Sequence, residues 1–257
     1  LPNLEFQAGY NKAITRPPID NLTGLWSVDE ANLRVNAPNP NLQAEHSKNL
    51  QSRLAYYFGG RSPGQVSVQV SQNTITNLRE TFDYTPAEFG VDDPDFATYT
   101  FRATRNSAEV RRFRSMELAY NQTLGFLPSE LLRGINVNLA YTRAYASQRR
   151  NGQAPHRLTG RLGYAYRRFS GTLAMVWKDD VPDGNYGSYI GAITQFDTTL
   201  NWRLTSRVSL YVQGRNISNQ PILRYISPTD VDEGVSPGLR QLRAYGANWV
   251  FGLKGFF

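Results

Sequence analysis

The most regular feature of the sequence is a strict alternation of apolar and polar residues. In the stretch GINVNLAYT, Ile135, Val137 and Leu139 fall on one side of an extended chain, whereas Asn136 and Asn138 fall on the other. A period of two residues predicts a β-strand with one apolar and one polar face. Helical periodicity is nearly absent, and only the stretch PSELLRG suits a helical turn. We therefore expect an all-β protein.

Alternating segments occur along the whole chain and predict about ten strands. They comprise approximately residues 3–14, 47–58, 64–75, 97–124, 134–145, 157–167, 170–179, 194–204, 207–217 and 242–257. The segment 97–124 is longer than the others, and we expect it to bend near Asn106.

The connections between these segments alternate in length. Residues 59–64, 167–170 and 204–207 are tight turns, and residues 125–134 form a connection of moderate length. The others are long and rich in Asp, Asn, Gly, Pro and Arg, and they are residues 15–46, 76–96, 146–156, 180–193 and 218–241. Short turns on one side and long loops on the other are typical of an antiparallel up-and-down transmembrane β-barrel.

Aromatic residues gather near both ends of the predicted strands. Those near the short turns are Tyr56, Tyr57, Phe58, Tyr164, Tyr166, Phe169, Trp202 and Phe257. Those near the long loops are Tyr10, Tyr141, Trp177 and Trp249. Such bands match the aromatic girdles of a membrane barrel, and strands of roughly 9–11 residues are long enough to cross a bilayer when tilted.

The charged residues of the strands fall almost entirely on one of the two faces. The charges on that face are Glu5, Arg53, Glu117, Arg161, Asp197, Arg215 and Lys254. An Arg or Lys that faces lipid at the middle of a bilayer costs about 2–4 kcal/mol, whereas a water-filled lumen carries no such penalty. We therefore expect the polar face to line a lumen and the apolar face to contact lipid.

Composition excludes several other classes of protein. The formal charge is +7, but the Arg residues are spread along the chain without a dense run, which argues against nucleic-acid binding. The absence of cysteine excludes disulfides, thiol catalysis and zinc–cysteine sites. No window of about 18 apolar residues is present, so no transmembrane helix is expected.

Three features suggest chemistry that their context does not support. GRSPG (60–64) matches a nucleophile elbow, but a predicted strand follows it where that motif needs a helix. His46 and His156 have no partner at metal-ligand spacing. The acidic stretch 83–95 lacks the ordered spacing of a calcium loop, and we interpret it as a solvated loop.

Four stretches, in order along the chain, resemble the β-barrel of TonB-dependent outer-membrane receptors. They are AITRPPIDNL with NPNLQAEHSKNLQSRLAYYF, then RRFRSMELAYNQTLGFLPSELLRGINVNLAYTRA, then LYVQGRNISNQP, and finally RAYGANWVFGLKGFF. The resemblance implies a 22-stranded barrel that is closed by an amino-terminal plug. Because the chain carries about ten strands and no plug or TonB box, we expect residues 1–257 to be the last ten strands, 13 to 22, of a longer receptor.

The resemblance also implies a function. Members of the family take up scarce substrates such as ferric siderophores, cobalamin or oligosaccharides across the outer membrane of Gram-negative bacteria. Their energy comes from the TonB–ExbB–ExbD complex, which engages the amino-terminal part of the receptor. On this interpretation the chain is not an enzyme, needs no cofactor and contributes half of the barrel wall, half of the lumen and about five extracellular loops.

Residue type and expected exposure single out nine candidates for substrate contact in the loops and the upper lumen. They are Tyr84, Phe89, Tyr99, Arg149, Arg150, Tyr186, Tyr189, Arg224 and Tyr225. A mouth that is rich in Arg and Tyr suits an anionic ferric siderophore or a sugar that stacks on aromatic rings.

The carboxyl terminus, WVFGLKGFF, predicts a final strand rather than a frayed tail. Trp249, Phe251, Leu253 and Phe257 alternate with Lys254 and other residues of the opposite face. The resemblance implies that a terminal Phe with this alternation is a sorting signal for the β-barrel assembly machinery.

Two alternatives from other classes remain open at this point. One is a complete small barrel enzyme of the outer membrane, with His156 as general base and Asp179 or Asp180 as its partner. The other is a soluble β-sandwich that acts as a binding module.

Overall fold

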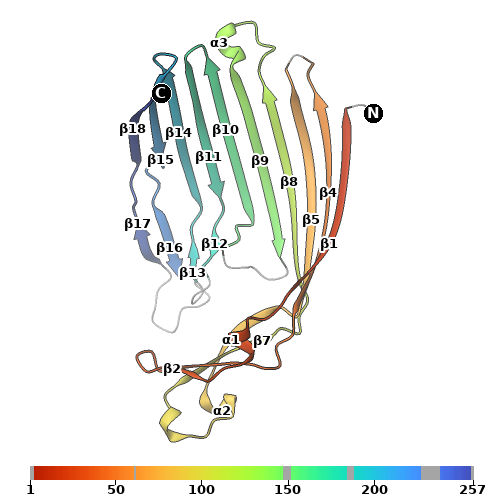
Figure 1. Ribbon diagram of the computed structural model, residues 1–257, viewed down its shortest axis with the longest axis vertical. Helices are drawn as coiled ribbons and strands as arrows, with labels where there is room; N and C mark the ends of the chain where they lie inside the picture. Colours follow the sequence, from red (N-terminus) through yellow and green to blue (C-terminus); the bar gives the residue numbers. More distant parts are fainter. Residues whose placement is uncertain (1–2, 61, 147–151, 184–187, 227–237, 256–257) are drawn as a thin grey trace. The chain divides into compact units, whose positions relative to one another are not determined.

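The computed structural model describes residues 3–60, 62–146, 152–183, 188–226 and 238–255 (Figure 1). The chain divides into two compact units. Unit 1 comprises Leu1–Ala8, Gln51–Ser71 and Arg114–Phe257, and unit 2 comprises Gly9–Leu50 and Gln72–Phe113. The two units are described separately below.

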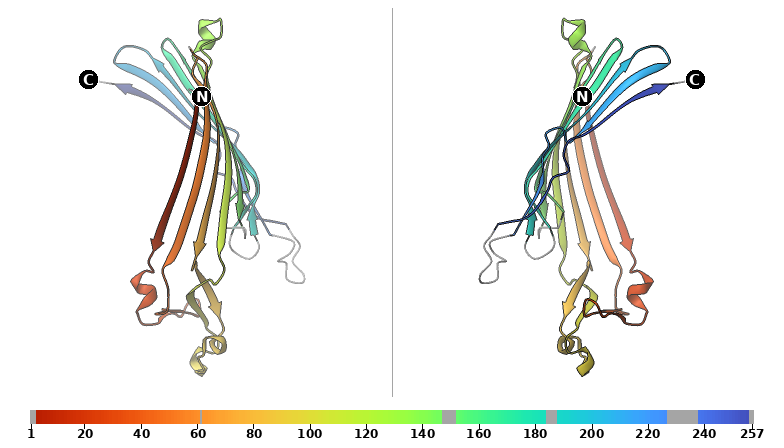
Figure 2. Two further views of the ribbon diagram at one scale, coloured as in Figure 1. Left: turned by 90° about the vertical axis from the view of Figure 1, so that its right-hand side faces the viewer. Right: turned by 90° about the vertical axis from the view of Figure 1, so that its left-hand side faces the viewer.

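The dominant element is a single ten-stranded sheet with the order β1-β4-β5-β8-β9-β10-β11-β14-β15-β18. Strands of this sheet that follow one another along the chain are also adjacent in the sheet, as Figure 1 shows for β9, β10 and β11 and as the order of the colours shows in Figure 2. The strands are β1 (Leu4–Thr15), β4 (Glu45–Phe58), β5 (Gly64–Thr76), β8 (Arg111–Thr123), β9 (Ile135–Ala146), β10 (His156–Tyr166), β11 (Phe169–Lys178), β14 (Ile193–Arg203), β15 (Val208–Arg215) and β18 (Asn248–Gly255). The all-β, antiparallel, up-and-down architecture is therefore confirmed.

Strands β1 and β18 are the two ends of this sheet and are not paired with each other in the described part of the chain. The ten strands thus form one open sheet rather than two packed sheets or a closed ten-stranded barrel. The soluble sandwich is wrong for this reason, because a sandwich needs two sheets packed face to face.

Strand register separates the apolar and polar residues onto two faces. Arg161 of β10 lies opposite Ala174 of β11, and Ala174 lies opposite Asp197 of β14. One position along, Leu162 lies opposite Leu173. A slip of one residue would exchange the two faces, so the hydrophobic pattern fixes the register. We call the face with Arg161 the polar face and the face with Leu162 the apolar face.

The apolar face is uncovered in unit 1. Leu118, Leu139, Leu162, Leu173 and Leu200 are between 37% and 47% exposed, although each lies near the middle of a strand. Soluble monomers rarely expose contiguous apolar patches larger than a few hundred Å². A row of this kind along successive strands is what lipid contact requires.

The short connections of unit 1 are tight for identifiable reasons. The turn between β10 and β11 contains Arg167 with a φ of 51°, a left-handed conformation that suits the twist of a two-residue hairpin. Gly134 precedes β9 and its carbonyl accepts from the backbone N–H of Ala165. A Cβ atom at Gly134 would lie 1.8 Å from the carbonyl oxygen of Ala165, so only glycine fits. The expected helical turn is confirmed as α3 (Glu130–Arg133).

Unit 2 contains a four-stranded sheet with the order β2-β3-β7-β6. The strands are β2 (Ser27–Asp29), β3 (Arg34–Ala37), β6 (Arg79–Tyr84) and β7 (Thr100–Asn106). Strands β3 and β7 are parallel, and the other pairs are antiparallel. Three short helical segments accompany them, α1 (Ile19–Leu22), α2 (Pro86–Phe89) and η1 (Pro94–Phe96).

The core of unit 2 is a cluster of aromatic rings around Phe101. Phe101 and Val35 are fully buried. The ring of Phe89 stacks on Phe101 with centroids 4.9 Å apart, and Trp26 meets Phe101 edge-on at 5.3 Å. Phe96 meets Trp26 edge-on at an interplanar angle of 83° and Phe101 at 65°. These contacts order a segment that the sequence predicts as irregular loop.

The expectation of one bent strand over 97–124 is wrong. Strand β7 ends at Asn106 and pairs in the sheet of unit 2, whereas β8 begins at Arg111 and pairs in the ten-stranded sheet. The side chain of Asn106 accepts from the backbone N–H of Gln43 and donates to two backbone carbonyls. Asn106 therefore ends the strand through bonds to distant segments, which a local pattern does not reveal.

A further four-stranded sheet has the order β12-β13-β16-β17. Its strands are β12 (Val181–Pro182), β13 (Ser188–Ile190), β16 (Ile222–Ile226) and β17 (Leu239–Arg243). The predicted last strand, 242–257, is therefore too long at its start, because Gly246 has a φ of 73° and separates β17 from β18. Among the described residues, no helix is long and apolar enough to cross a membrane.

Candidate functional site

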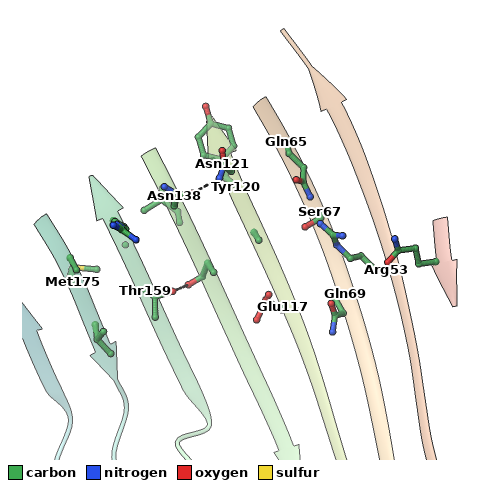
Figure 3. Close-up of a pocket in the computed structure, with 18 residues that line it drawn as sticks. Arg53, Gln65, Ser67, Gln69, Glu117, Tyr120, Asn121, Asn138, Thr159 and Met175 are labelled. Atoms are coloured by element: carbon green, nitrogen blue, oxygen red, sulfur yellow. Dashed lines mark hydrogen bonds between the residues drawn. The ribbon is translucent and has the colours of Figure 1, made fainter. Parts of the chain in front are cut away.

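The polar face of unit 1 is hollowed over strands β1, β4, β5, β8, β9, β10 and β11 (Figure 3). The hollow has a volume of about 680 Å³. The side chains that project into the hollow come from the middle of each strand and from the half nearer the short turns. Because every second residue of a strand faces this side, the alternation of the sequence places the polar lining residues, such as Gln7, Arg53 and Glu117, in the hollow.

Three of the predicted lumen charges line this hollow together. Arg53 comes from β4, Glu117 from β8 and Arg161 from β10. Glu117 accepts a hydrogen bond from the hydroxyl of Thr142 on β9 at 3.3 Å. The hollow therefore carries two positive charges and one negative charge, a balance that suits an anionic group.

The other predicted lumen charges lie on the same face. Asp197 continues the row of Arg161 through Ala174, and Lys254 lies opposite Ser209. Glu5 of β1 accepts hydrogen bonds from the hydroxyl of Tyr57 and from the side-chain amide of Gln7. The assignment of these charges to one face is confirmed by the register.

Side-chain amides supply most of the remaining polar surface of the hollow. Asn121 of β8 donates to Asn138 of β9, and Figure 3 shows the two meeting across the strands. Gln65, Gln69 and Ser67 project from β5. The sequence analysis did not select these amides, although their alternation with Val in QVSVQVS is the signal that places them. Such a lining offers many neutral donors and acceptors to a passing polar molecule.

A second polar region lies in the sheet of β12, β13, β16 and β17. Arg224 of β16 forms an ion pair with Asp183, which also accepts from the hydroxyl of Ser188 at 3.4 Å. Arg224 also donates to Gln241 of β17 at 3.3 Å. Tyr225 stacks on Tyr189 of β13. Arg224 thus bridges neighbouring strands and is not a free cation.

The predicted contact residues fall into two separate groups. Tyr84, Phe89 and Tyr99 belong to unit 2 and are half-buried. Tyr189, Arg224 and Tyr225 belong to unit 1, are half-buried and contact one another through the Tyr stack and the strand pairing. Arg149, Arg150 and Tyr186 lie outside the described residues.

Unit 2 is held together by polar contacts as well as by its aromatic core. Arg102 of β7 donates two hydrogen bonds to the carboxylate of Asp83 on β6, at 2.7 and 2.9 Å, and these bonds lower the pKa of Asp83. In the capping box of α2, hydrogen bonds from Thr85 lower the pKa of Glu88. Hydrogen bonds from Asn32 lower the pKa of Asp29 in the same way.

The residues that suggested other chemistry make structural contacts. His156 is hydrogen-bonded to the hydroxyl of Tyr141 at 2.6 Å, on the apolar face. Ser62 of GRSPG lies in the turn before β5 and is buried. Asp93 caps η1 by accepting from the backbone N–H of Asp95. The described part of the chain contains no group of three or more His, Asp or Glu residues that could hold a metal ion.

The predicted assembly residues share one face of β18. Trp249, Phe251 and Leu253 are 46%, 68% and 69% exposed and lie opposite Gly214, Val212 and Leu210 of β15. They belong to the apolar face, as the alternation predicts. Phe257 lies outside the described residues.

The family model for the TonB-dependent receptor-like β-barrel matches residues 1–217. The chain belongs to this family. The match covers nine of the ten strands of the large sheet, all except β18. The recognition from the four sequence stretches is therefore confirmed. The comparison with curated proteins found no match.

Solved receptor structures share the fold. A mutant of the ferric enterobactin receptor of Pseudomonas aeruginosa has a TM-score of 0.68 at 15% identity, over 99% of this chain and 38% of that one. The hemophore receptor of Serratia marcescens, solved with its hemophore and heme, has a TM-score of 0.66 at 17% identity, over 100% and 38%. A siderophore receptor of Pseudomonas aeruginosa has a TM-score of 0.63 at 14% identity, over 99% and 40%. The chain thus spans about two fifths of the length of these receptors.

Proposed function

We propose that the chain is the carboxyl-terminal part of an active outer-membrane transporter that takes up a scarce small molecule with energy from the TonB–ExbB–ExbD system. The observation that carries the proposal is the hollow on the polar face of a TonB-dependent receptor barrel, with Arg53, Glu117 and Arg161 inside it. The uncovered apolar face supports a lipid environment for the same strands.

In this proposal the chain corresponds to the last ten strands of a 22-stranded barrel in the outer membrane of a Gram-negative bacterium. The solved receptors that resemble it are longer, and this chain covers about two fifths of each. The plug and the TonB box belong to the part of the receptor that lies outside residues 1–257. The β-barrel assembly machinery inserts the strands, and outer-membrane lipid surrounds the apolar face.

The substrate that the chemistry favours is an anionic ferric siderophore. The hollow has one positive charge in excess, and guanidinium groups bind carboxylate and catecholate oxygens through forked hydrogen bonds. Two solved relatives are named as receptors for a ferric siderophore or a siderophore. Cobalamin and oligosaccharides, which other members of the family transport, are the alternatives, and an oligosaccharide would use the Asn and Gln side chains of the lining.

Six candidates in the described residues would make the first contacts of the substrate. Tyr189 and Tyr225 offer a stacked aromatic pair that suits a planar ligand, and Arg224, which is paired with Asp183, holds the neighbouring strands in place beside it. The other three, in unit 2, are Tyr84, Phe89 and Tyr99. Arg149, Arg150 and Tyr186 remain candidates on the basis of the sequence alone.

No observation favours the barrel enzyme as a second function. That hypothesis needs His156 at the rim with an acid as its partner, but the ring of His156 is engaged by Tyr141 on the apolar face. Asp179 contacts His156 through its backbone N–H, and its carboxylate accepts from Asp180. This geometry orients the imidazole by a phenol rather than by a carboxylate.

An uptake assay tests the proposal. The full-length receptor and its Arg53→Gln, Arg161→Gln variant would be expressed in a strain that lacks the native gene, and uptake of iron-55 complexed with a panel of siderophores would be measured. We expect wild-type uptake that stops when TonB is deleted, and uptake that is roughly tenfold lower in the double variant because two charge-assisted contacts are lost.

The matched control is Arg207→Gln, which removes an exposed Arg from a short turn and leaves the hollow intact. Its uptake should equal that of the wild type. Uptake of no substrate in the panel, or uptake that persists without TonB, would overturn the proposed function. Equal uptake by the wild type and the double variant would overturn the role of the hollow.

A further inference from the structure

The apolar face of unit 1 changes character near the long-loop ends of its strands. Along β9, apolar-face residues run from Ile135 through Leu139 to Arg143. Along β10, the same face begins at His156 and continues with Leu158 and Leu162. In each strand the basic residue lies at the end that leads to a long connection, and the leucines follow toward the short turn.

The same order occurs in strands β8 and β4. The apolar-face positions of β8 read Arg112, Arg114, Met116 and Leu118 from its long-loop end. Those of β4, whose first residues belong to unit 2, read His46, Lys48 and Leu50. Within unit 1, strands β8, β9 and β10 therefore each place a basic side chain near the long-loop end of a face that is otherwise apolar.

Within unit 1, three of these basic residues come close together on adjacent strands. Arg143 of β9 lies directly opposite His156 of β10. Asn121 bonds Asn138, and Glu117 bonds Thr142, so β8 and β9 share one register over this stretch.

The register of β8 and β9 also places Arg114 opposite Tyr145, three residues from the Glu117–Thr142 pair toward the long-loop end. Arg114 and Arg143 are exposed, and Tyr145 is 44% exposed. We call Arg114, Arg143 and His156 the basic cluster.

Aromatic rings support the basic cluster from both sides. The guanidinium of Arg143 lies 4.6 Å from the centre of the Tyr145 ring. The hydroxyl of Tyr141 bonds Nδ1 of His156 and orients its imidazole. Tyr and Trp at this level of a membrane barrel mark the lipid–water interface. The cluster therefore lies where lipid headgroups lie, on the side that faces them.

No carboxylate neutralises Arg143 within the part of the chain that the structure describes. The ion pairs found there involve Arg79, Arg102, Arg111 and Arg224, and none involves Arg143. Asp179, which directly follows β11, donates its backbone N–H to the carbonyl of His156, and its carboxylate accepts from the backbone N–H of Asp180. An uncompensated cation on a lipid-facing surface calls for an anion from the lipid.

We propose that the basic cluster binds the phosphate of an anionic lipid headgroup in the membrane leaflet at the long-loop end of the barrel. Arg143 contacts the phosphate oxygens, Arg114 adds a second positive charge beside it, Tyr145 holds Arg143 in place, and the leucines below contact the acyl chains. The inference rests on the membrane location in the proposed function and not on the transported substrate. It adds a site on the outside of the barrel that the transport route does not use.

The test uses the full-length receptor in neutral detergent and titrates it with a fluorescent phosphatidic acid or with the matched phosphatidylcholine. The Arg114→Gln, Arg143→Gln variant keeps the side-chain length and removes two charges. We expect its affinity for phosphatidic acid to fall roughly tenfold or more, since each basic side chain near an anionic lipid surface contributes separately. Affinity for phosphatidylcholine should not change.

The matched control is Arg157→Gln, which removes a charge from the same level of β10 but from the polar face. Its affinity for phosphatidic acid should remain within about twofold of the wild type. Equal losses in the control and the double variant, or no loss in either, would overturn the site.

A competition with inorganic phosphate tests whether the site binds free phosphate or the phosphate of a lipid headgroup. Inorganic phosphate is added first at the concentration of the lipid and then in large excess. We expect competition only at large excess. Displacement of the lipid by equal concentrations of inorganic phosphate would overturn the assignment to a lipid. Uptake measured on the same variants reports on the transport function independently, so failure of one proposal is distinguishable from failure of the other.

Discussion

The ring of Tyr189 stacks on the ring of Tyr225, with centroids 5.2 Å apart and planes inclined by 19°. The two residues come from β13 and β16 and are paired directly in the sheet. Arg224, the neighbour of Tyr225 in the chain, is fixed by its ion pair with Asp183. Two long connections that the sequence predicts as irregular thus present an ordered aromatic pair.

Replacing either tyrosine by leucine should weaken the binding of the transported substrate. A substrate that stacks on this pair would lose an aromatic contact of about 0.5–1.5 kcal/mol, so Tyr189→Leu or Tyr225→Leu should lower the affinity by roughly twofold to tenfold. Titration of the full-length receptor with the substrate identified by uptake would measure this. Tyr245→Leu, at a tyrosine that is 71% exposed, is the control and should leave the affinity unchanged. A loss of the same size at Tyr245 would contradict the role of the stack.

Truncating Phe101 should unfold unit 2 locally. Phe101 is fully buried among Trp26, Phe89 and Phe96, and removal of a buried phenyl ring costs about 3–5 kcal/mol. Limited proteolysis of the full-length receptor should then show rapid cleavage of Phe101→Ala between residues 79 and 106. Phe82→Ala, at a ring that is 42% exposed, should be cleaved as slowly as the wild type. Slow cleavage of both variants would show that the aromatic cluster is not the core of unit 2.

The ion pair between Asp83 and Arg102 should stabilise unit 2 in a pH-dependent manner. Because Arg102 lowers the pKa of Asp83 in the folded state, the stabilisation is present above the unfolded value of about 3.9 and is lost as the pH falls through the folded value. Both side chains are more than a third exposed, so the contribution is about 1 kcal/mol or less.

Comparison of the wild type with Asp83→Asn by hydrogen exchange isolates this carboxylate from the other acids of unit 2. Amides of β6 and β7 should exchange faster in Asp83→Asn at pH 6, and the difference between the two proteins should shrink as the pH falls below the unfolded value of about 3.9. A difference that persists at the lower pH would assign the effect to packing rather than to charge.

A charge placed on the apolar face of β18 should impair membrane insertion. Phe251 is 68% exposed on that face, and an Arg there costs about 2–4 kcal/mol at mid-bilayer. Phe251→Arg in the full-length receptor should therefore reduce the heat-modifiable, protease-resistant form in outer-membrane fractions. Val250→Arg, one position along on the polar face, should assemble normally. Equal yields of the two variants would contradict the assignment of faces.

Deletion of Phe257 addresses assembly separately from stability. If the terminal Phe is the sorting signal, the deletion should delay assembly in cells, whereas refolding of the purified protein into detergent should be unchanged. Normal assembly in cells would remove the sorting role and leave the barrel in place.

The ten strands and their two faces could be predicted because a strand in a membrane barrel is constrained residue by residue. Each position falls on either the apolar or the polar face, so the sequence itself shows that Leu162 and Arg161 lie on opposite faces. Three of the charges that line the hollow were identified in the same way. The amides Gln69 and Asn138 were not selected, because polar residues on the polar face are too common to distinguish one from another.

The sequence by itself thus determined the family, the strand count, the alternation of short and long connections and the polar face that carries Arg53, Glu117 and Arg161, but it did not predict the basic residues Arg114 and Arg143 on the apolar face. Only the tertiary structure decided what the long connections do. Arg34–Ala37 pairs in parallel with residues 100–103, and Ser188–Ile190 pairs with residues 224–226. These strands are short, and their partners lie far away in the chain, so no local period marks them. Their order comes from the burial of Phe101, the bonds of Asn106 and the Arg224–Asp183 ion pair, which exist only once distant segments meet.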